Sequence, residues 1–264
     1  MIKGIDISSM QGTINWESVA ASGVEFCIIR CGVGNNGIDS MYTTNIAGAQ
    51  SVGIKVMAYH FVFPLPTTAA EPTRDPKIQA QMHATAANGV LAACDLEWPV
   101  QGDWAKWGCS APQIVEWVTE YLQAYERITG IKPIVYTFPN FAQCINLPAS
   151  FAATYQLWIA SYENSPYIPS PWNDYVLWQN SGSGKLPNGV TVDTDFAKDL
   201  SLWGPATIVA APVPVLVSDP TPAPASAPAP APAPVIVSPV PGSSSSIIDT
   251  IGSFLTSLFN KLGK

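Results

Sequence analysis

Val90-Leu91-Ala92-Ala93-Cys94-Asp95-Leu96-Glu97-Trp98 begins as an apolar run without charge and ends in two carboxylates. Such a run predicts a strand buried on both faces, as in a parallel sheet. Side chains alternate across a strand, so Asp95 and Glu97 point the same way, with Cα atoms roughly 6.6 Å apart. Two acids in a dry site raise one pKa relative to the other, which divides the pair into a proton donor and an anion. Glycosidic bond cleavage requires that division; two solvated acids in a loop are the alternative.

Strand-like and helix-like segments alternate up to about residue 205. The predicted strands are residues 3–7, 25–32, 54–61, 90–95, 133–137, 157–161, 175–179 and 190–193, and the clearest helices are residues 41–52, 75–88 and 110–129. Short connections rich in Pro, Gly, Ser and Asn join the last three strands, and they are too short for full crossover helices. We therefore predict an α/β fold, a (β/α) barrel whose last strands are mostly β-connected, with an open doubly wound sheet as the alternative.

The predicted strand ends carry acids and aromatic residues, and in a barrel functional side chains lie at such ends. The acids are Asp6, Asp95, Glu97, Asp193 and Asp195; the candidate sugar contacts are Tyr59, Tyr136, Trp158, Tyr162, Trp178 and Gln179. Acids for the chemistry and aromatic faces for stacking on pyranose rings predict a carbohydrate site. Arg30 either pairs with a rim acid or contacts substrate, and His60 is given no role.

Composition excludes other classes of function. A net charge of −7 argues against a nucleic-acid partner, and two histidines make a histidine-rich metal site improbable. The five cysteines form no C-x-x-C pair, which predicts reduced thiols in a protein made in the cytoplasm. The N-terminal residues lack the apolar segment of a signal peptide, so we expect synthesis without one.

Eight short blocks, in this order, resemble glycoside hydrolase family 25, the bacterial and phage muramidases. They are residues 4–12 (GIDISSMQG) with 14–16, residues 26–30 (FCIIR), 58–61 (AYHF), 95–97 (DLE), 134–137 (IVYT), 157–162 (LWIASY), 177–179 (LWQ), and 192–193 with Phe196. The resemblance covers roughly residues 2–200. Met10 stands where the family usually has Trp, and Asp195 where Asn is common.

The resemblance implies a flattened TIM-like barrel that hydrolyses the β-1,4 bond from N-acetylmuramic acid to N-acetylglucosamine in peptidoglycan, without a metal or organic cofactor. It implies that Glu97 is the general acid and that Asp95 holds the 2-acetamido group of the substrate or stabilises the cationic intermediate. Asp6 and Asp193 complete an acidic cluster that helps to keep Glu97 protonated. For Asp195 we expect hydrogen bonding at the barrel rim.

Two further segments follow the predicted catalytic barrel of residues 1–205. Residues 206–242 hold eleven of the 25 prolines, which predicts an extended Pro/Ala-rich linker. Residues 243–264 predict an amphipathic helix, with Ile248, Ile251, Leu255, Leu258 and Leu262 along its apolar stripe. For this stripe we favour membrane or envelope contact over self-association or docking on the barrel.

Two alternatives to an active muramidase stay open at this point. A non-catalytic glycan-binding barrel does not require so many clustered acids, and a hydrolase of chitin-like N-acetylglucosamine polymers follows the same acetamido chemistry. Synthesis without a signal peptide suits a phage endolysin that is made in the host cytoplasm and acts on the cell wall after release.

Leu255→Asp tests the predicted apolar stripe. A charge in its centre should strongly reduce binding to liposomes, whereas Ser257→Asp on the polar face should leave binding nearly unchanged. Sedimentation of both variants and the unchanged chain with liposomes, together with their mass in solution, measures this. If Leu255→Asp changes neither liposome binding nor mass, membrane contact and self-association are both wrong.

Overall fold

The structure is a computed structural model that describes residues 1–64, 74–98 and 110–204. The predicted linker (residues 206–242) and the predicted amphipathic helix (residues 243–264) lie outside the described residues. The boundaries predicted for these two segments lie outside them as well. In the described part of the chain, none of the helices is both long and apolar enough to cross a membrane.

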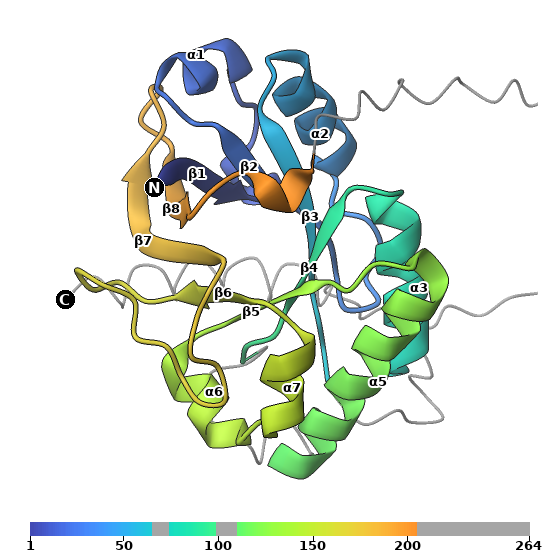
Figure 1. Ribbon diagram of the computed structural model, residues 1–264. Coiled ribbons are helices and arrows are strands. Elements are labelled where there is room, and N and C mark those ends of the chain that lie inside the picture. Colours follow the sequence, from blue (N-terminus) through green and yellow to red (C-terminus); the bar gives the residue numbers. More distant parts are fainter. Residues whose placement is uncertain (65–73, 99–109, 205–264) are drawn as a thin grey trace, which may run out of the picture. The chain divides into compact units, whose positions relative to one another are not determined.

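Eight strands form a closed barrel in chain order (Figure 1). They are β1 (Ile2–Ile7), β2 (Phe26–Val33), β3 (Lys55–Phe61), β4 (Leu91–Asp95), β5 (Ile134–Thr137), β6 (Leu157–Ala160), β7 (Leu177–Lys185) and β8 (Thr191–Ala197). Neighbours from β1 to β7 are parallel, while β8 is antiparallel to both β7 and β1. Because β8 pairs with β1, the sheet has closed on itself, and the alternative of an open doubly wound sheet is wrong.

The orientation of β8 follows from the short segment that precedes it. Residues 186–190 join β7 to β8, and a parallel crossover needs a dozen residues or more, so the chain turns back as a hairpin. Gly189 in this turn has φ of 84°, a conformation that costs glycine little. The predicted β-connected end of the barrel is therefore confirmed for β7 and β8, although both strands are longer than predicted.

Helices lie outside the barrel, and several were not predicted. The helices are α1 (Trp16–Ala21), α2 (Tyr42–Ser51), α3 (Pro76–Ala87), α5 (Ala111–Thr129), α6 (Pro139–Ile145) and α7 (Ala149–Thr154), with 3-10 turns η1 (Ser9–Gln11) and η3 (Ser201–Trp203). The predictions for α2, α3 and α5 are confirmed within a few residues. The short helices α1, α6 and α7 were missed because six or seven residues give too little periodicity to detect.

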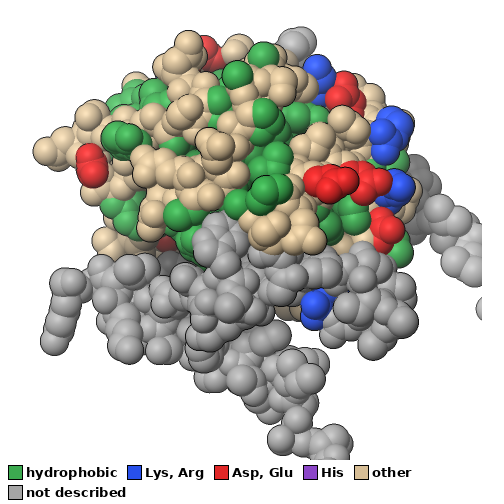
Figure 2. Space-filling view, turned by 90° about the horizontal axis from the view of Figure 1, so that it is seen from below, with side chains coloured by type: hydrophobic (Ala, Val, Ile, Leu, Met, Phe, Trp, Pro, Cys, Tyr) green, Lys and Arg blue, Asp and Glu red, His purple; other side chains and the backbone are tan. Residues whose placement is uncertain are grey.

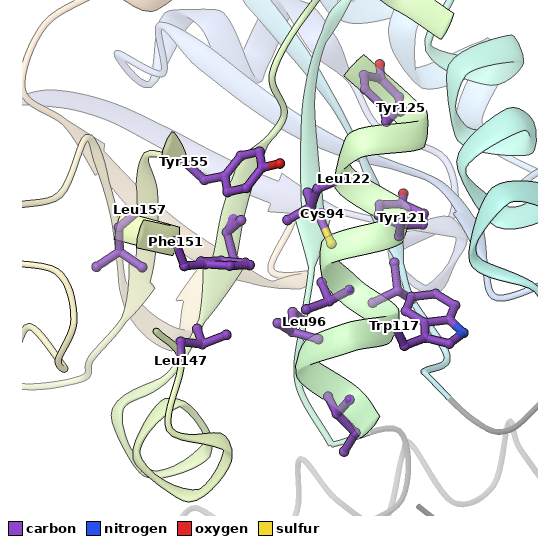
Figure 3. Packing of buried hydrophobic residues seen from close by; sticks show 14 of the residues in the cluster. Cys94, Leu96, Trp117, Tyr121, Leu122, Tyr125, Leu147, Phe151, Tyr155 and Leu157 are labelled. Atoms are coloured by element: carbon purple, nitrogen blue, oxygen red, sulfur yellow. The ribbon is translucent and has the colours of Figure 1, made fainter. Parts of the chain in front are cut away.

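Helix α5 has the end signals that its sequence indicates. Ser110 and Gln113 form a capping box at its start, and the Ser110 backbone N–H donates to Gln113 Oε1 at 2.8 Å. Gly130 ends the helix in the left-handed conformation, with φ of 73°. The apolar face of α5 packs against β4 through Leu122 and neighbouring side chains, and it meets Phe151 of α7 in the same cluster (Figure 3).

The barrel interior is a separate apolar core under the strand ends. Its buried members are Phe26, Ile28, Met57, Tyr59, Ala93, Ile134, Tyr136, Trp158, Ala160, Leu177 and Ala197. Gly4 on β1 is required here, because a Cβ atom at this position would lie 2.2 Å from the Phe26 ring. The polar side chains at the strand ends lie on top of this apolar core.

The buried thiols and imidazoles belong to the packing. Cys27, Cys31 and Cys94 are free and buried, as predicted. His60 Nε2 lies 2.9 Å from the backbone oxygen of Gly34, and burial lowers its pKa to about 4, so it is a neutral core histidine.

On the face seen in Figure 2, charged side chains of both signs gather at one edge. Apolar and other uncharged groups make up most of the remaining described surface in this view.

Candidate active site

Four acids meet inside one end of the barrel, where the parallel strands finish. Asp6 and Asp95 lie in the last positions of β1 and β4 that face inward, and each is 6% exposed. Asp193 on β8 is directly opposite Asp6, and such antiparallel partners have Cβ atoms about 4.5–5.5 Å apart. Glu97 follows β4 by two residues and is partly exposed. The structure therefore brings together the four acids that the sequence predicts.

Burial and mutual repulsion hold the pKa values of these acids high. The pKa of Glu97 is raised to about 7, first by burial and then by the charge of Asp193. Burial also raises the pKa of Asp95, as do the charges of Glu97 and Asp6, whereas Arg30 lowers it. The positive charge of Arg30 therefore offsets part of the rise at Asp95.

Asp95 also has a free hydrogen-bonding position. Its Oδ1 atom is buried and has no hydrogen-bond donor among the described residues. A buried carboxylate oxygen without a donor is costly, so such positions call for a functional explanation. This oxygen can accept an N–H from a bound molecule.

Gln179 organises the site next to Asp6. Its Nε2 atom donates to Asp6 Oδ2 at 2.7 Å. Its Oε1 atom accepts from two tyrosine hydroxyls, Tyr136 at 3.1 Å and Tyr162 at 2.9 Å. Because both hydroxyls donate to the amide oxygen, the amide nitrogen is directed at Asp6. Gln179, Tyr136 and Tyr162 thus lie together beside Asp6.

The aromatic candidates differ in how much of each ring is accessible. Tyr162 is 58% exposed, so its ring can stack on a ligand while its hydroxyl stays bound to Gln179. Tyr59 and Tyr136 are 9% and 8% exposed, and each packs on Trp158. Little of either ring is therefore left for stacking on a ligand.

Trp158 and Trp178 do not occupy the positions expected of sugar contacts. Trp158 is 1% exposed and packs against Tyr59 and Tyr136, and its Nε1 atom donates to Asp195 Oδ1 at 2.8 Å. Trp178 belongs to the outer core between barrel and helices, where its Nε1 atom donates to the Ser161 oxygen. Neighbouring strand residues face opposite ways, so Trp178 and Gln179 cannot both line the site. The expectation for Trp178 is corrected on this ground.

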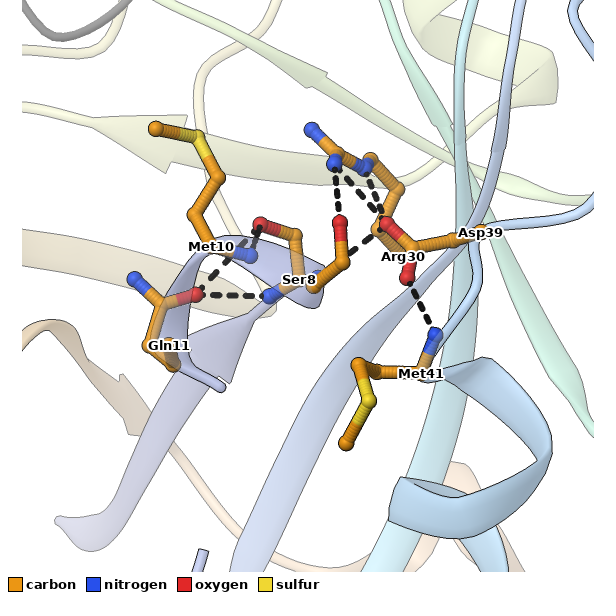
Figure 4. A network of polar contacts seen from close by, with 7 residues as sticks. Ser8, Met10, Gln11, Arg30, Asp39 and Met41 are labelled. Carbon is orange, nitrogen blue, oxygen red and sulfur yellow. Dashed lines mark hydrogen bonds and ion pairs between the residues drawn. The ribbon is translucent and has the colours of Figure 1, made fainter. Parts of the chain in front are cut away.

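Arg30 pairs with Asp39, an acid outside the predicted site residues (Figure 4). The guanidinium donates to Asp39 Oδ2 through Nε at 2.9 Å and lies within 2.8 Å through Nη2. The same carboxylate accepts the Ser9 and Met41 backbone N–H groups. Asp39 was missed because it follows β2 in a loop, where neither alternation nor strand ends identify it. The network fixes the turn that carries Met10, which is 46% exposed.

Asp195 lies inside the barrel and not at its rim. Its side chain is 0% exposed, and burial raises its pKa to about 8.

Among residues 1–64, 74–98 and 110–204, no group of three or more His, Cys, Asp or Glu side chains is arranged to hold a metal ion.

Comparison with known proteins gives a consistent result. The profile of glycosyl hydrolases family 25 matches residues 5–189. The chain is 28% identical to the N,O-diacetylmuramidase of Chalaropsis sp over 71% of this chain and 94% of that protein. It is 28% identical to Lysozyme M1 of Streptomyces globisporus over 75% and 67% of the two chains. The solved bacterial lysozyme from Streptomyces coelicolor superposes with a TM-score of 0.68 at 26% identity, over 76% of this chain and 96% of that chain.

Arg30→Met tests the ion pair that holds the rim. It leaves the Asp39 side chain, which is 2% exposed, without its cation, so we expect a loss of about 3–5 kcal/mol in the free energy of unfolding. Arg30→Met combined with Asp39→Asn should lose less, because no charge is then left buried. Denaturant unfolding of the wild type and the variants measures this, and a double variant as unstable as Arg30→Met would contradict it.

Proposed function

Since this chain belongs to glycosyl hydrolases family 25 and is a glycoside hydrolase of the muramidase type, we propose that it cleaves the β-1,4 bond between N-acetylmuramic acid and N-acetylglucosamine in peptidoglycan. The observation that carries the proposal is the pair Asp95 and Glu97 at the end of β4. One member is buried, while the other is partly exposed with a pKa near neutrality.

Glu97 is the proposed general acid. It is the accessible member of the pair, and a pKa of about 7 keeps much of it protonated at neutral pH. In the first step it gives this proton to the oxygen of the leaving sugar as the glycosidic bond breaks. Its carboxylate then takes a proton from the attacking water, so the same group acts as base in the second half of the reaction.

Asp95 is the proposed partner that handles the positive charge. Oxocarbenium-like charge develops at the reacting carbon, and an anion close by stabilises it. The Oδ1 atom of Asp95, which lacks a donor among the described residues, can accept the acetamido N–H of the substrate instead. The nearby charge of Arg30 supports either role because it lowers the pKa of Asp95 and so favours its anion.

Asp6 and Asp193 are proposed to set the electrostatics around this pair. The charge of Asp193 raises the pKa of Glu97, and the charge of Asp6 raises the pKa of Asp95. For substrate contact we propose Tyr162 as a stacking platform, with Tyr59, Tyr136 and Gln179 offering polar edges. Trp158 packs against Tyr59 and Tyr136 and supports these two rings.

The place of action follows from the proposed substrate. Peptidoglycan lies outside the cytoplasm, so we propose that the enzyme reaches the cell wall after synthesis, in a lytic role of the phage endolysin kind. The tail after residue 205 is proposed to contact membrane or envelope.

The lytic role can be tested by expressing the protein inside bacterial cells, with and without a second protein that forms a membrane pore. We expect lysis when the pore is present. Lysis without the pore would contradict the proposal that the enzyme must be released to reach the cell wall.

Glu97→Gln tests the general acid. The amide keeps the shape of the side chain but cannot donate a proton of suitable acidity, so we expect normal folding and a loss of activity of at least about 10³-fold. Mass spectrometry of digests of purified peptidoglycan should find N-acetylmuramic acid at new reducing ends with wild type and not with the variant.

The matched control is Glu116→Gln, on the exposed side of α5, which should cleave like wild type. Near wild-type turnover by Glu97→Gln would overturn the assignment. New N-acetylglucosamine reducing ends would contradict the proposed bond, and cleavage of chitin oligomers but not peptidoglycan would favour a chitin-like substrate.

The pH dependence of the rate gives a second test. A general acid works only while protonated, so kcat/KM should fall on the alkaline side with an apparent pKa of about 7. In Asp193→Asn a charge that raises this pKa is absent, so the alkaline limb should move to lower pH. Asp199→Asn, at an exposed position, should leave the limb in place. An alkaline limb that does not move in Asp193→Asn would contradict the proposed coupling.

A further inference from the structure

Tyr162 combines an exposed ring with a fixed hydroxyl. The residue is 58% exposed, yet its hydroxyl donates to Gln179 Oε1 at 2.9 Å. A tyrosine at a surface usually keeps its apolar body against the protein and its polar tip in water. Here the tip is bound within the site, while much of the ring stays open. In the proposed function the ring is a stacking platform, which leaves the hydroxyl without a role.

Gln179 receives this hydroxyl and a second one. The Tyr136 hydroxyl donates to the same Oε1 atom at 3.1 Å. Tyr136 is on β5 and Gln179 is on β7, so this bond reaches across β6. The β6 residue paired with Gln179 is Ala160, whose small side chain leaves room for the contact. An amide oxygen has two lone pairs, so the two hydroxyls together fill its accepting capacity.

Both hydroxyls are donors at neutral pH. Burial raises the pKa of Tyr136 and of Tyr162, and the charges of the neighbouring acids raise both values further. Each hydroxyl therefore keeps its proton and can give it to the amide oxygen. Gln179 is 3% exposed, so water replaces a lost hydroxyl poorly. The position of the amide thus depends on these two bonds.

The nitrogen end of the same amide holds Asp6. Gln179 Nε2 donates to Asp6 Oδ2 at 2.7 Å, a short distance for an N–H···O bond. The last side-chain torsion of an aspartate has a broad range when nothing holds it, and this bond restricts it. Asp6 is 6% exposed, and its charge raises the pKa of Asp95. The direction in which Asp6 faces the acid cluster therefore follows the direction of the Gln179 amide.

We propose that the Tyr162 hydroxyl and Gln179 position Asp6, so that Tyr162 has two separable roles: its ring binds a sugar, and its hydroxyl orients Asp6 through the amide. The consequence for catalysis rests on the proposed function. Stacking on the ring stabilises the bound sugar before and during the reaction, so its loss raises KM. The direction of an acid matters where charge develops, so its loss lowers kcat.

Tyr162→Phe keeps the ring and removes the hydroxyl. We expect kcat on soluble peptidoglycan fragments to fall by roughly 3–10-fold, the effect of one ordinary hydrogen bond, while KM stays close to the wild-type value. Tyr162→Leu removes the ring as well, so KM should also rise. The matched control is Tyr167→Phe. Tyr167 is 52% exposed, but its hydroxyl accepts from Gln143 of α6, so both constants should stay at wild-type values.

Two results with Tyr162→Phe would overturn the proposal. One is a kcat equal to that of wild type. The other is a rise in KM alone, because the hydroxyl would then act by contact with the sugar and not through Gln179.

A double-mutant cycle tests the route through the amide. Gln179→Met keeps the length of the side chain but lacks both the N–H donor and the oxygen, so kcat should fall by roughly 10–100-fold. If the hydroxyl acts through Gln179, adding Tyr162→Phe to Gln179→Met should cost nothing more. Losses that multiply, or a wild-type kcat in Gln179→Met, would overturn this route. Tyr162→Phe alone keeps the proposal testable if the buried substitution prevents folding.

Nuclear magnetic resonance of the Gln179 side-chain amide needs no substrate. In the wild type its assigned ¹H–¹⁵N signals should exchange slowly with solvent. Exchange should be roughly 3–10-fold faster in Tyr162→Phe and unchanged in Tyr167→Phe. Equal exchange in wild type and Tyr162→Phe would overturn the proposal. Faster exchange in Tyr162→Phe, with no cleavage of peptidoglycan by the wild type, would support the positioning contact and refute the proposed function alone.

Discussion

Burial of several carboxyl groups in one end of a closed barrel is the constraint on which the rest of the site depends. Closure places β8 against β1, so Asp193 and Asp195 come from the last strand to meet Asp6 on the first. Charges this close and this dry cannot all ionise: burial raises the pKa of all three, and each pKa is raised further by the charge of one of the other two. The polar groups around them, Gln179, Trp158 and Arg30, are placed where they offset part of that cost.

Features that depend on local pattern could be predicted from the sequence. The strand that carries Asp95 is a continuous apolar run, and α5 has both a cap and an apolar stripe, so each is identified by its own residues. The acids at strand ends could be placed together because parallel strands of a barrel finish at one end. The short helices α6 and α7 and the true length of β7 could not, since tertiary packing and not local pattern decides them.

Side-chain direction was the weakest part of the prediction, for an identifiable reason. Trp178 and Gln179 are neighbours on β7, and alternation allows one of them to face inward. Gln179 does so and bonds Asp6, while Trp178 packs with Phe196 in the outer core. Strict use of the two-residue period would have selected one of the two. No comparable rule identifies Asp39 as the partner of Arg30, because loop geometry brings that pair together.

A cation acts on the acid cluster from its mouth. The positive charge of Arg30 lowers the pKa of Asp95, against burial and the charges of Glu97 and Asp6, which raise it. Arg30 is itself tied to Asp39, whose carboxylate also accepts the backbone N–H groups of Ser9 and Met41. The charge that acts on the reacting pair is therefore positioned by a loop outside the cluster.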